Sequence, residues 1–197
     1  MFIPNIDKYK ILLASQSPRR QQLLKEIGLE FTVTKKSYSD ENFPNHLVRE
    51  EIALYLAEHK ASFFNVEINP NEIIITADTI VWLNNEVLNK PVDFNDAVLM
   101  LEKLSGNCHQ VYTGVCIKSK EKSILFYAAS DVFFRNLTQE EIHFYVENYK
   151  PYDKAGAYGI QEWIGYIGIE KINGSFYNVM GLPIQKLYLE LNKFINS

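Results

Sequence analysis

The stretch ILLASQSPRRQQLLKEIG, residues 11–28, decides how the fold begins. The apolar run 11–14 predicts a buried strand, and the small polar residues after it lead into a helix. Ser17 suits the N-cap of this helix, Pro18 its first position, and Gly28 the left-handed residue that follows its last turn. The stretch therefore predicts a strand, a short loop and a helix, in that order.

Two arginines, Arg19 and Arg20, occupy the first turn of the predicted helix. The helix dipole favours negative charge at that end, so two cations there make sense if an anion binds beside them. A helix N-terminus reached through small residues can hold a phosphate, and guanidinium groups and the hydroxyls of Ser15 and Ser17 can complete the cradle. The local pattern leaves one alternative open, a solvated pair of arginines on an ordinary amphipathic helix.

Composition limits the class of protein. The 197 residues are 47% hydrophobic, which suffices for the core of one domain with two lobes, and the net charge of −4 gives no basis for binding nucleic acid or a membrane surface. Cys108 and Cys116 match no disulfide framework, so free thiols in a reducing cytoplasm are expected. There is no signal-peptide pattern and no apolar run near the length of about 18 residues that a membrane span needs.

Strand and helix patterns alternate along the rest of the chain. Strand patterns occur at residues 31–34, 73–83, 86–88, 109–118 and 123–135, and helix patterns at 46–64, 94–104, 139–148 and 183–194. Asn173 and Gly174 predict a hairpin between residues 166–172 and 175–180. Together these patterns predict an α/β protein with a mixed sheet and flanking helices.

Short motifs predict how some of these elements begin and turn. Asn84 and Asn85 predict a tight turn between the strands at 73–83 and 86–88. The strands at 109–118 and 123–135 are expected to form an antiparallel pair around the polar turn 119–122. Asp93 is the predicted N-cap of the helix at 94–104, and Thr138 with Glu141 forms a capping-box signature for the helix that follows.

Asp78 stands inside the apolar strand pattern IIITADTIVWL, residues 73–83. An ionised carboxylate there is costly unless it is paired, hydrogen-bonded or bound to a metal. The functional interpretation is a general base or a metal ligand held on a rigid strand, and the alternative is a turn cap or an ion pair with a lysine. Glu41 could join Asp78, since Mg²⁺ beside substrate phosphates uses one or two carboxylates.

Lys60, Lys90 and Lys154 stand in segments that are predicted to be ordered. Their ammonium groups suit a polyphosphate, whose spread charge needs several cations, although each could equally be a solvated surface lysine. The sequence contains no H-E-x-x-H, P-loop, G-x-G-x-x-G or G-x-S-x-G motif, which argues against zinc proteases, P-loop and Rossmann nucleotide binding and serine hydrolases.

Seven short motifs recur in an order that resembles one family. They are S-Q-S-P-R-R at 15–20, A-D-T-I-V at 77–81, N-K-P at 89–91, L-S-G at 104–106, H-Q-V-Y-T-G-V at 109–115, K-A-G-A-Y-G-I-Q at 154–161 and N-G-S-F-Y-N-V-M-G-L-P at 173–183. Together they closely resemble the Maf family of nucleoside triphosphate pyrophosphatases. The resemblance covers about residues 11–183, nearly the whole chain.

The resemblance implies a fold and a reaction. The fold would be an elongated α/β structure with two lobes around a cleft, similar to the inosine-triphosphate pyrophosphatase fold, in a single Maf-like domain over residues 1–197. The reaction would be hydrolysis of a nucleoside triphosphate to the monophosphate and pyrophosphate. A divalent metal, Mg²⁺ or Mn²⁺, would be the cofactor.

The resemblance also assigns site residues. The proton acceptor of the family corresponds to Asp78, and an acidic residue that would bind the metal with it corresponds to Glu41. The phosphate-binding side chains of the family correspond to Arg19, Arg20, Lys60 and Lys90.

The motif K-A-G-A-Y-G-I-Q is similar to that of the dTTP/UTP-specific branch, whose specificity positions correspond to Arg19, Thr79 and Gln161. The amide of Gln161 offers both a donor and an acceptor to a pyrimidine edge. After Gln161 the branch commonly has glycine, whereas this chain has Glu162 and Trp163.

Other functions remain open at this point. One is a pyrophosphatase for another or modified nucleotide, such as 7-methyl-GTP. A different class is a nucleotide-binding regulator of septum formation, which would bind dTTP or UTP with little turnover. The oligomeric state is also open, since an exposed hairpin or the C-terminal helix could support a homodimer.

Overall fold

The computed structural model describes residues 2–34, 42–64 and 68–197. Its strands are β1 (Lys10–Leu13), β2 (Thr32–Val33), β3 (Glu72–Leu83), β4 (Glu86–Leu88), β5 (Cys108–Lys118), β6 (Ser123–Phe134) and β7 (Ile169–Asn173). Its α-helices are α1 (Pro18–Glu26), α2 (Glu50–Ser62), α3 (Phe94–Leu104), α4 (Gln139–Tyr149), α5 (Trp163–Gly168), α6 (Phe176–Val179) and α7 (Ile184–Asn196), and its short 3-10 helices are η1 (Ile6–Lys8) and η2 (Ala155–Ala157).

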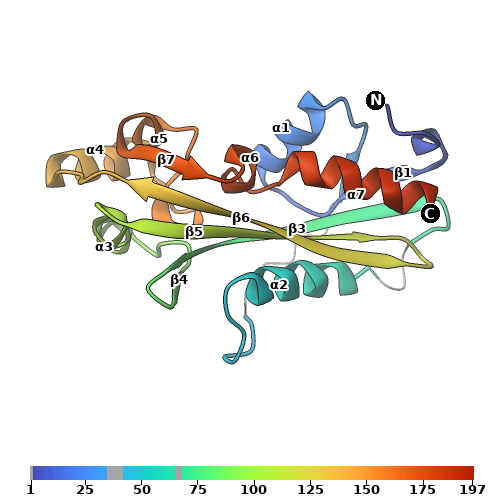
Figure 1. Cartoon of the computed structure of the whole chain (residues 1–197), viewed down its shortest axis with the longest axis horizontal. Coiled ribbons are helices and arrows are strands. Elements are labelled where there is room, and N and C mark those ends of the chain that lie inside the picture. The colour runs from blue at the N-terminus through green and yellow to red at the C-terminus, as the bar shows by residue number, and fades with distance from the viewer. Residues whose placement is uncertain (1, 35–41, 65–67) are drawn as a thin grey trace. The chain divides into compact units, whose positions relative to one another are not determined.

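The strands form one mixed sheet in the order β2-β1-β3-β5-β6-β7, with β4 paired to β3 (Figure 1). β1 runs parallel to both β2 and β3, and the helices α1 and α2 lie in the connections between these three strands. β4 is antiparallel to β3, and β7 is antiparallel to β6. The predicted α/β fold with a mixed sheet and flanking helices is confirmed.

The chain divides into two compact units. The first unit comprises Met1–Asp78, Thr113–Ala128 and Gly181–Ser197, and the second comprises Thr79–Tyr112 and Ala129–Met180. The single domain over residues 1–197 stays a prediction.

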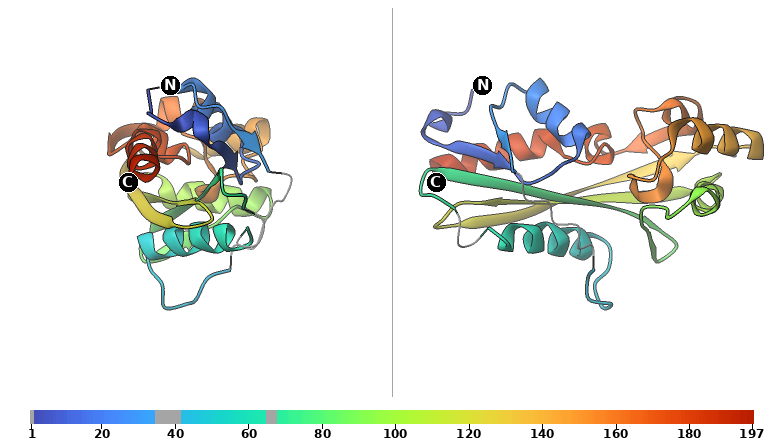
Figure 2. Two further views of the ribbon diagram at one scale, coloured as in Figure 1. Left: turned by 90° about the vertical axis from the view of Figure 1, so that its right-hand side faces the viewer. Right: turned by 180° about the vertical axis from the view of Figure 1, so that it is seen from behind.

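In the first unit, α2 covers one face of the sheet, and α1 and α7 cover the other (Figures 1 and 2). β1 and β3 supply the centre of its core through fully buried leucine and isoleucine side chains, with Leu13 paired to Ile75 in the sheet. Gly114 lets α2 approach β5 closely, because a Cβ at this position would stand 2.2 Å from the carbonyl oxygen of Ala53. The packing of α2 therefore depends on a residue without a side chain.

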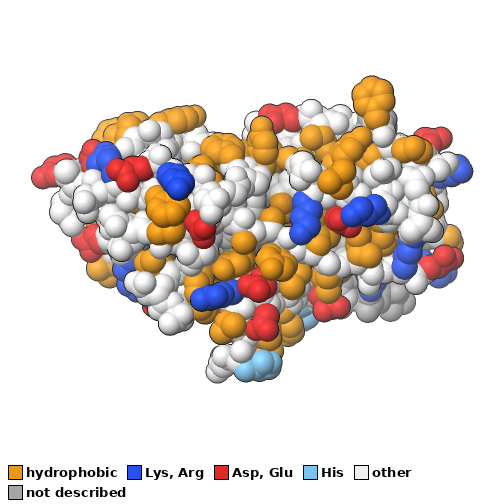
Figure 3. Space-filling view, in the orientation of Figure 1, with side chains coloured by type: hydrophobic (Ala, Val, Ile, Leu, Met, Phe, Trp, Pro, Cys, Tyr) orange, Lys and Arg blue, Asp and Glu red, His pale blue; other side chains and the backbone are white. Residues whose placement is uncertain are grey.

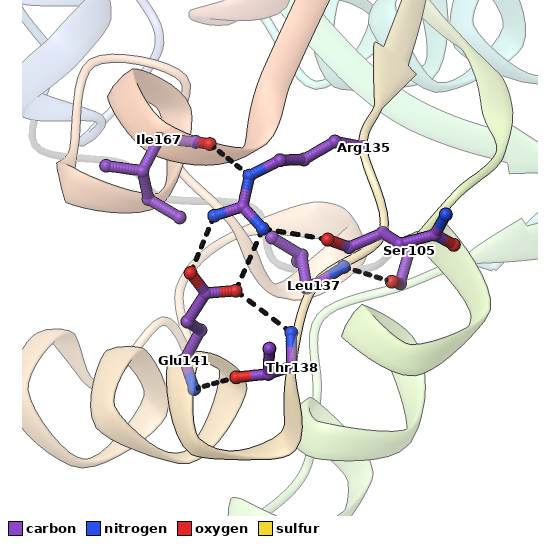
Figure 4. Close-up of polar contacts among 7 residues, drawn as sticks. Ser105, Arg135, Leu137, Thr138, Glu141 and Ile167 are labelled. Atoms are coloured by element: carbon purple, nitrogen blue, oxygen red, sulfur yellow. Dashed lines mark hydrogen bonds and ion pairs between the residues drawn. The ribbon is translucent and has the colours of Figure 1, made fainter.

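In the second unit, α3 packs against α4 and η2. α4 begins with the predicted capping box, in which the Thr138 side chain accepts from the backbone of Glu141 and the Glu141 side chain accepts from the backbone of Thr138. The Glu141 carboxylate also accepts two hydrogen bonds from the Arg135 guanidinium, at 2.9 and 2.7 Å (Figure 4). This bidentate pair joins the end of β6 to the start of α4.

Several local predictions are confirmed. Asn84 and Asn85 both have positive φ angles, 49° and 66°, in the tight turn between β3 and β4. The Asp93 side chain caps α3 by accepting from the backbone N–H of Asp96 at 2.9 Å. Gly28 follows α1 with a φ of 73°. β5 and β6 are neighbours joined by the turn at residues 119–122, which makes them the expected antiparallel hairpin.

The predicted helix at residues 46–64 is too long at its N-terminal end. α2 begins at Glu50, because Arg49 before it has a φ of 50°, which a right-handed helix cannot contain. The Glu51 carboxylate accepts the backbone N–H of Val48 at 3.0 Å and stabilises the turn that precedes the helix.

The predicted hairpin at residues 166–180 is wrong. Residues 163–168 form α5, β7 then pairs with β6, and the chain enters α6 after Gly174 instead of a returning strand. Ser175 caps α6 by accepting from the backbone N–H of Asn178 at 3.3 Å. Gly174 itself passes so close to Ser130 that a Cβ would stand 2.6 Å from its hydroxyl. Here the glycine serves a close backbone approach rather than a hairpin turn.

Two further expectations concern the environment of the chain. Cys108 and Cys116 are free thiols, as expected. Within the described ranges, no helix has the length and apolar character needed to cross a membrane.

Candidate active site

The loop before α1 belongs to the first unit and lies beside β3. The backbone N–H of Ala14 donates to the carbonyl of Ile75 at 2.9 Å, which continues the β1–β3 pairing into the loop. Ser17 occupies the N-cap position of α1, and within the described chain its side chain makes no capping hydrogen bond. The Ser15 hydroxyl accepts from the backbone N–H of Ser17 at 3.3 Å. The N-terminus of α1 thus carries two serines and Arg19, with no acidic side chain in its first turn.

Arg20 anchors this loop to two distant segments of the first unit. Its Nε donates to the carbonyl of Gly181 at 2.7 Å, and its Nη1 donates to the carbonyl of Ala77 at 2.9 Å and to the Ser15 hydroxyl at 3.3 Å. Ala77 immediately precedes Asp78, so Arg20 holds the α1 loop next to the carboxylate. Sequence reasoning predicted a phosphate ligand and missed this anchoring role, because backbone carbonyl partners leave no residue pattern.

The carboxylate of Asp78 on β3 forms an ion pair with the ammonium group of Lys60 on α2. Their side chains are only 10% and 13% exposed, respectively. The Thr76 hydroxyl donates to the carbonyl of Ala57 at 2.6 Å, and Thr76 and Asp78 lie on the same face of β3 because side chains alternate along a strand. The strand therefore presents Asp78 to the C-terminal part of α2.

Asp78 and Lys60 are both predicted site residues. Their contact is also the ion pair with a lysine that the sequence analysis left open as a structural alternative for Asp78. Removing two charges from water is costly, so a nearly buried pair is weak evidence of a purely stabilising role. An ionised carboxylate has about four acceptor positions, so Asp78 can interact with other groups besides Lys60. The geometry is compatible with a base or ligand role and with a structural one.

In the second unit, the segment 154–161 packs against β3 and bonds to the residue before Lys90. The backbone N–H of Gly156 donates to the carbonyl of Asn89 at 3.1 Å, next to Lys90. A Cβ on Gly156 would stand 3.0 Å from the side chain of Val81, so the segment packs directly against β3. Thr79 shares the face of β3 with Val81, because the two are alternate residues of the strand.

Gln161 carries a buried acceptor. In the part of the chain that the structure describes, its amide oxygen Oε1 is inaccessible to solvent and has no hydrogen-bond donor. A buried acceptor without a donor costs about 1–3 kcal/mol, so this oxygen can take a hydrogen bond from a water molecule or from a ligand.

Lys154 differs from the other predicted lysines. It is buried, and its ammonium group contacts the carboxylates of Asp153 at 2.7 Å and Glu162 at 3.1 Å. Its charge is therefore compensated within the second unit, and the phosphate-binding role that the sequence suggested for it stays a prediction. Lys90, by comparison, is exposed.

The predicted metal ligands are Asp78 and Glu41, and Glu41 lies outside the described residues. Among the described residues, no three His, Cys, Asp or Glu side chains form a group that could hold a metal ion. A carboxylate oxygen on a rigid strand nevertheless fits a hard cation, since Mg²⁺ takes one or two carboxylates and completes its shell with phosphates and water.

Charged side chains of both signs are interspersed on the face of the molecule in Figure 3. Any positive field that attracts an anion must therefore be local, as the net charge of −4 already indicates.

The fold and these residues define a mixed α/β protein with a basic helix N-terminus placed next to a strand carboxylate. The family described as "Maf-like protein" matches residues 10–194. A dTTP/UTP pyrophosphatase from Bacteroides thetaiotaomicron is 54% identical over 96% of this chain and 98% of its own length. A dTTP/UTP pyrophosphatase from Parabacteroides distasonis is 53% identical over 98% of this chain and 100% of its own length. The chain belongs to the Maf-like protein family.

Among solved structures, a HAM1 protein from Coxiella burnetii matches with a TM-score of 0.47 and 14% identity, over 94% of this chain and 99% of that chain. This likeness is too weak to carry an inference about chemistry, which depends on the residues described above.

Proposed function

We propose that the protein hydrolyses dTTP and UTP to the nucleoside monophosphate and pyrophosphate. The observation that carries the proposal is the placement of Asp78. Its carboxylate is paired with Lys60, and the residue before it is bonded to Arg20 of the α1 loop. A carboxylate, an ammonium group and a basic helix N-terminus thus meet within one unit. The two relatives named dTTP/UTP pyrophosphatase support the same activity.

The basic side chains would bind the triphosphate. Backbone N–H groups at the N-terminus of α1, the hydroxyls of Ser15 and Ser17 and the guanidinium of Arg19 suit phosphate oxygens. The remaining proposed phosphate ligands are Arg20, Lys60 and Lys90. Cations at these oxygens would stabilise the charge that develops on the leaving pyrophosphate.

Asp78 would act as the general base. A water oxygen forms a bond to the α-phosphorus while the bond to the bridging oxygen breaks, and pyrophosphate leaves with that oxygen. The proton of the attacking water passes to the Asp78 carboxylate. A rigid strand suits this role because it holds the base in one position.

Asp78, with Glu41 as the second proposed ligand, would hold a divalent cation, Mg²⁺ or Mn²⁺. When bound, the cation would neutralise phosphate charge and lower the pKa of a coordinated water.

Base selection would fall to Arg19, Thr79 and Gln161. The buried Oε1 of Gln161 can accept the N3–H of thymine or uracil, while its amide N–H₂ can donate to a neighbouring carbonyl. In the same orientation of the amide, cytosine would present the lone pair of its N3 to the Gln161 oxygen, so two acceptors would face each other.

A panel of nucleoside triphosphates, assayed for pyrophosphate with Mg²⁺ or Mn²⁺, tests the proposal. We expect release from dTTP and UTP to exceed release from CTP, ATP, GTP and 7-methyl-GTP, and to stop when EDTA removes the metal. A preference for 7-methyl-GTP or another nucleotide would overturn the substrate assignment. Tight binding of dTTP with no turnover would overturn the enzyme and favour a nucleotide-binding regulator.

Asp78→Asn tests the base. Loss of a general base is expected to lower kcat for dTTP by about 10²–10⁴-fold while the protein stays folded. Glu72→Gln is the matched control, because Glu72 lies on the same strand and also pairs with a lysine, Lys10, at 3.3 Å. The control should retain normal turnover. A folded Asp78→Asn with normal kcat would contradict the assignment.

The proposal includes a cytoplasmic location, a possible homodimer and no nucleic-acid partner. Two free thiols suit a reducing compartment. Light scattering after size exclusion tests the homodimer, since a monomer has a mass of 22.8 kDa.

A further inference from the structure

In the second unit, the carboxylate of Glu162 links the two ends of the segment 154–162. Lys154 begins the segment and Glu162 ends it, and the Lys154 ammonium lies 3.1 Å from Oε1 of Glu162. The Lys154 side chain is 9% exposed and that of Glu162 is 20% exposed, so the pair is largely shielded from water. An ion pair between the two ends removes much of the conformational freedom of the residues between them.

Tyr145 of α4 connects the middle of the same segment to the same carboxylate. Its hydroxyl accepts the backbone N–H of Gly159 at 3.0 Å and donates to Oε2 of Glu162. Burial, and then the hydrogen bond to Glu162, raise the pKa of Tyr145 well above its ordinary value, so the hydroxyl stays a donor at neutral pH. The two oxygens of Glu162 thus contact the start of the segment and, through Tyr145, its centre.

Gly159 makes room for this arrangement. A Cβ at this position would stand 2.7 Å from the carboxyl carbon of Glu162. The carboxylate can therefore occupy its position only because residue 159 has no side chain. The contacts of Glu162 depend on two other members of the segment, Lys154 and Gly159, and on one residue of α4.

We propose that Glu162 is a positioning residue for nucleotide selection, which holds the segment 154–162 in the conformation that presents Gln161. Gln161 immediately precedes Glu162, and in the described part of the chain its buried Oε1 has no donor. This inference rests on the proposed function of Gln161.

Glu162→Ala removes the carboxylate, and Lys154 keeps its contact with Asp153. With Gln161 less firmly held, we expect the ratio of kcat/KM for dTTP over CTP to fall about tenfold, mainly through a higher KM for dTTP. The value of kcat for dTTP should change less than about twofold, because the proposed base Asp78 is not altered. Glu162→Gln keeps an acceptor for Tyr145 and should restore part of the ratio.

Gly159→Ala tests the position of the Glu162 carboxylate without removing a charged group. Its Cβ would displace the Glu162 carboxylate, so it should lower the dTTP/CTP ratio in the same direction as Glu162→Ala. Glu86→Gln is the matched control, since Glu86 pairs with Lys103 at 2.7 Å on the surface of the same unit. The control should leave the ratio unchanged.

Equilibrium binding of dTTP and CTP, measured by calorimetry without metal, separates this inference from the proposed function. If the wild type binds dTTP over CTP but releases no pyrophosphate, the enzyme proposal fails and the binding ratio still reports on Glu162. If folded Glu162→Ala retains the wild-type ratio in both assays, the inference is wrong. Equal losses for dTTP and CTP would also overturn it, since they would show a purely structural role.

Discussion

The charged group of the first unit and the segment 154–162 of the second unit are built in different ways. In the first unit, Asp78 and Lys60 project from a long strand and a helix, and Arg20 fixes the neighbouring loop to backbone carbonyls. In the second unit, side chains hold an irregular segment in place, through the carboxylate of Glu162 and the hydroxyl of Tyr145.

This difference teaches where each property of the proposed enzyme would be most easily changed. Regular elements hold their side chains through many backbone hydrogen bonds, so one substitution there changes chemistry more than position. An irregular segment depends on a few side-chain contacts, so one substitution can move it. Turnover should therefore respond mainly to substitutions in the group Asp78, Lys60 and Arg20. The preference for dTTP over CTP should respond mainly to substitutions in the segment 154–162.

Among the substitutions that test this comparison, Lys60→Met is expected to have the largest effect. It leaves the nearly buried Asp78 carboxylate without its cation, which should lower the free energy of unfolding by about 3 kcal/mol. Loss of one cation at the phosphates should lower kcat/KM by about 10²-fold. The loss should be equal for dTTP, UTP and CTP, and kinetics with urea unfolding would measure both effects. Unequal losses for the three nucleotides would show that the group Asp78, Lys60 and Arg20 also selects the base.

Acid should destabilise the protein through His109 of the second unit. Burial lowers the pKa of His109 from 6.5 to about 3, and its ring nitrogen Nε2 lies 2.7 Å from the Tyr158 hydroxyl. Between these pH values the unfolded chain binds a proton that the folded chain does not, so stability falls as pH falls, with a slope approaching about 1.4 kcal/mol per pH unit.

Urea unfolding between pH 6.5 and 5 measures this slope in a range where the carboxylates with lowered pKa stay ionised. His109→Gln does not titrate and should flatten the slope. His46 is exposed, so His46→Gln serves as the control and should keep the wild-type slope of stability against pH. Equal slopes in all three proteins would contradict the assignment to His109.

Thr138→Ala should have the smallest effect. Loss of the capping box at α4 is expected to cost about 1 kcal/mol of stability. The dTTP/CTP ratio should not change, because the Tyr145 hydroxyl and Glu162 keep their contacts. A shift of the ratio would mean that the segment 154–162 responds to any weakening of α4, and the comparison between the two groups would lose its basis. Melting temperature and the nucleotide panel together measure the outcome.

Much of the fold could be predicted from local patterns. The strand of Asp78, the Asn84–Asn85 turn, the Asp93 cap and the Thr138 capping box all appear where the sequence places them, because each depends on residues close together in the chain. The hairpin after Asn173 could not be predicted correctly. Gly174 is required there by its approach to Ser130, a contact between residues far apart in the sequence.

For the candidate site, the sequence by itself determined which side chains can carry the chemistry. The motifs of residues 15–20 and 77–81 and the basic character of the first turn of α1 depend only on residue order. The tertiary structure decided which of these side chains meet. It paired Lys60 with Asp78, used Arg20 to anchor the α1 loop, and paired Lys154 with Glu162. The physical reason is that an ion pair or a buried acceptor depends on distances across the fold, which no local pattern contains.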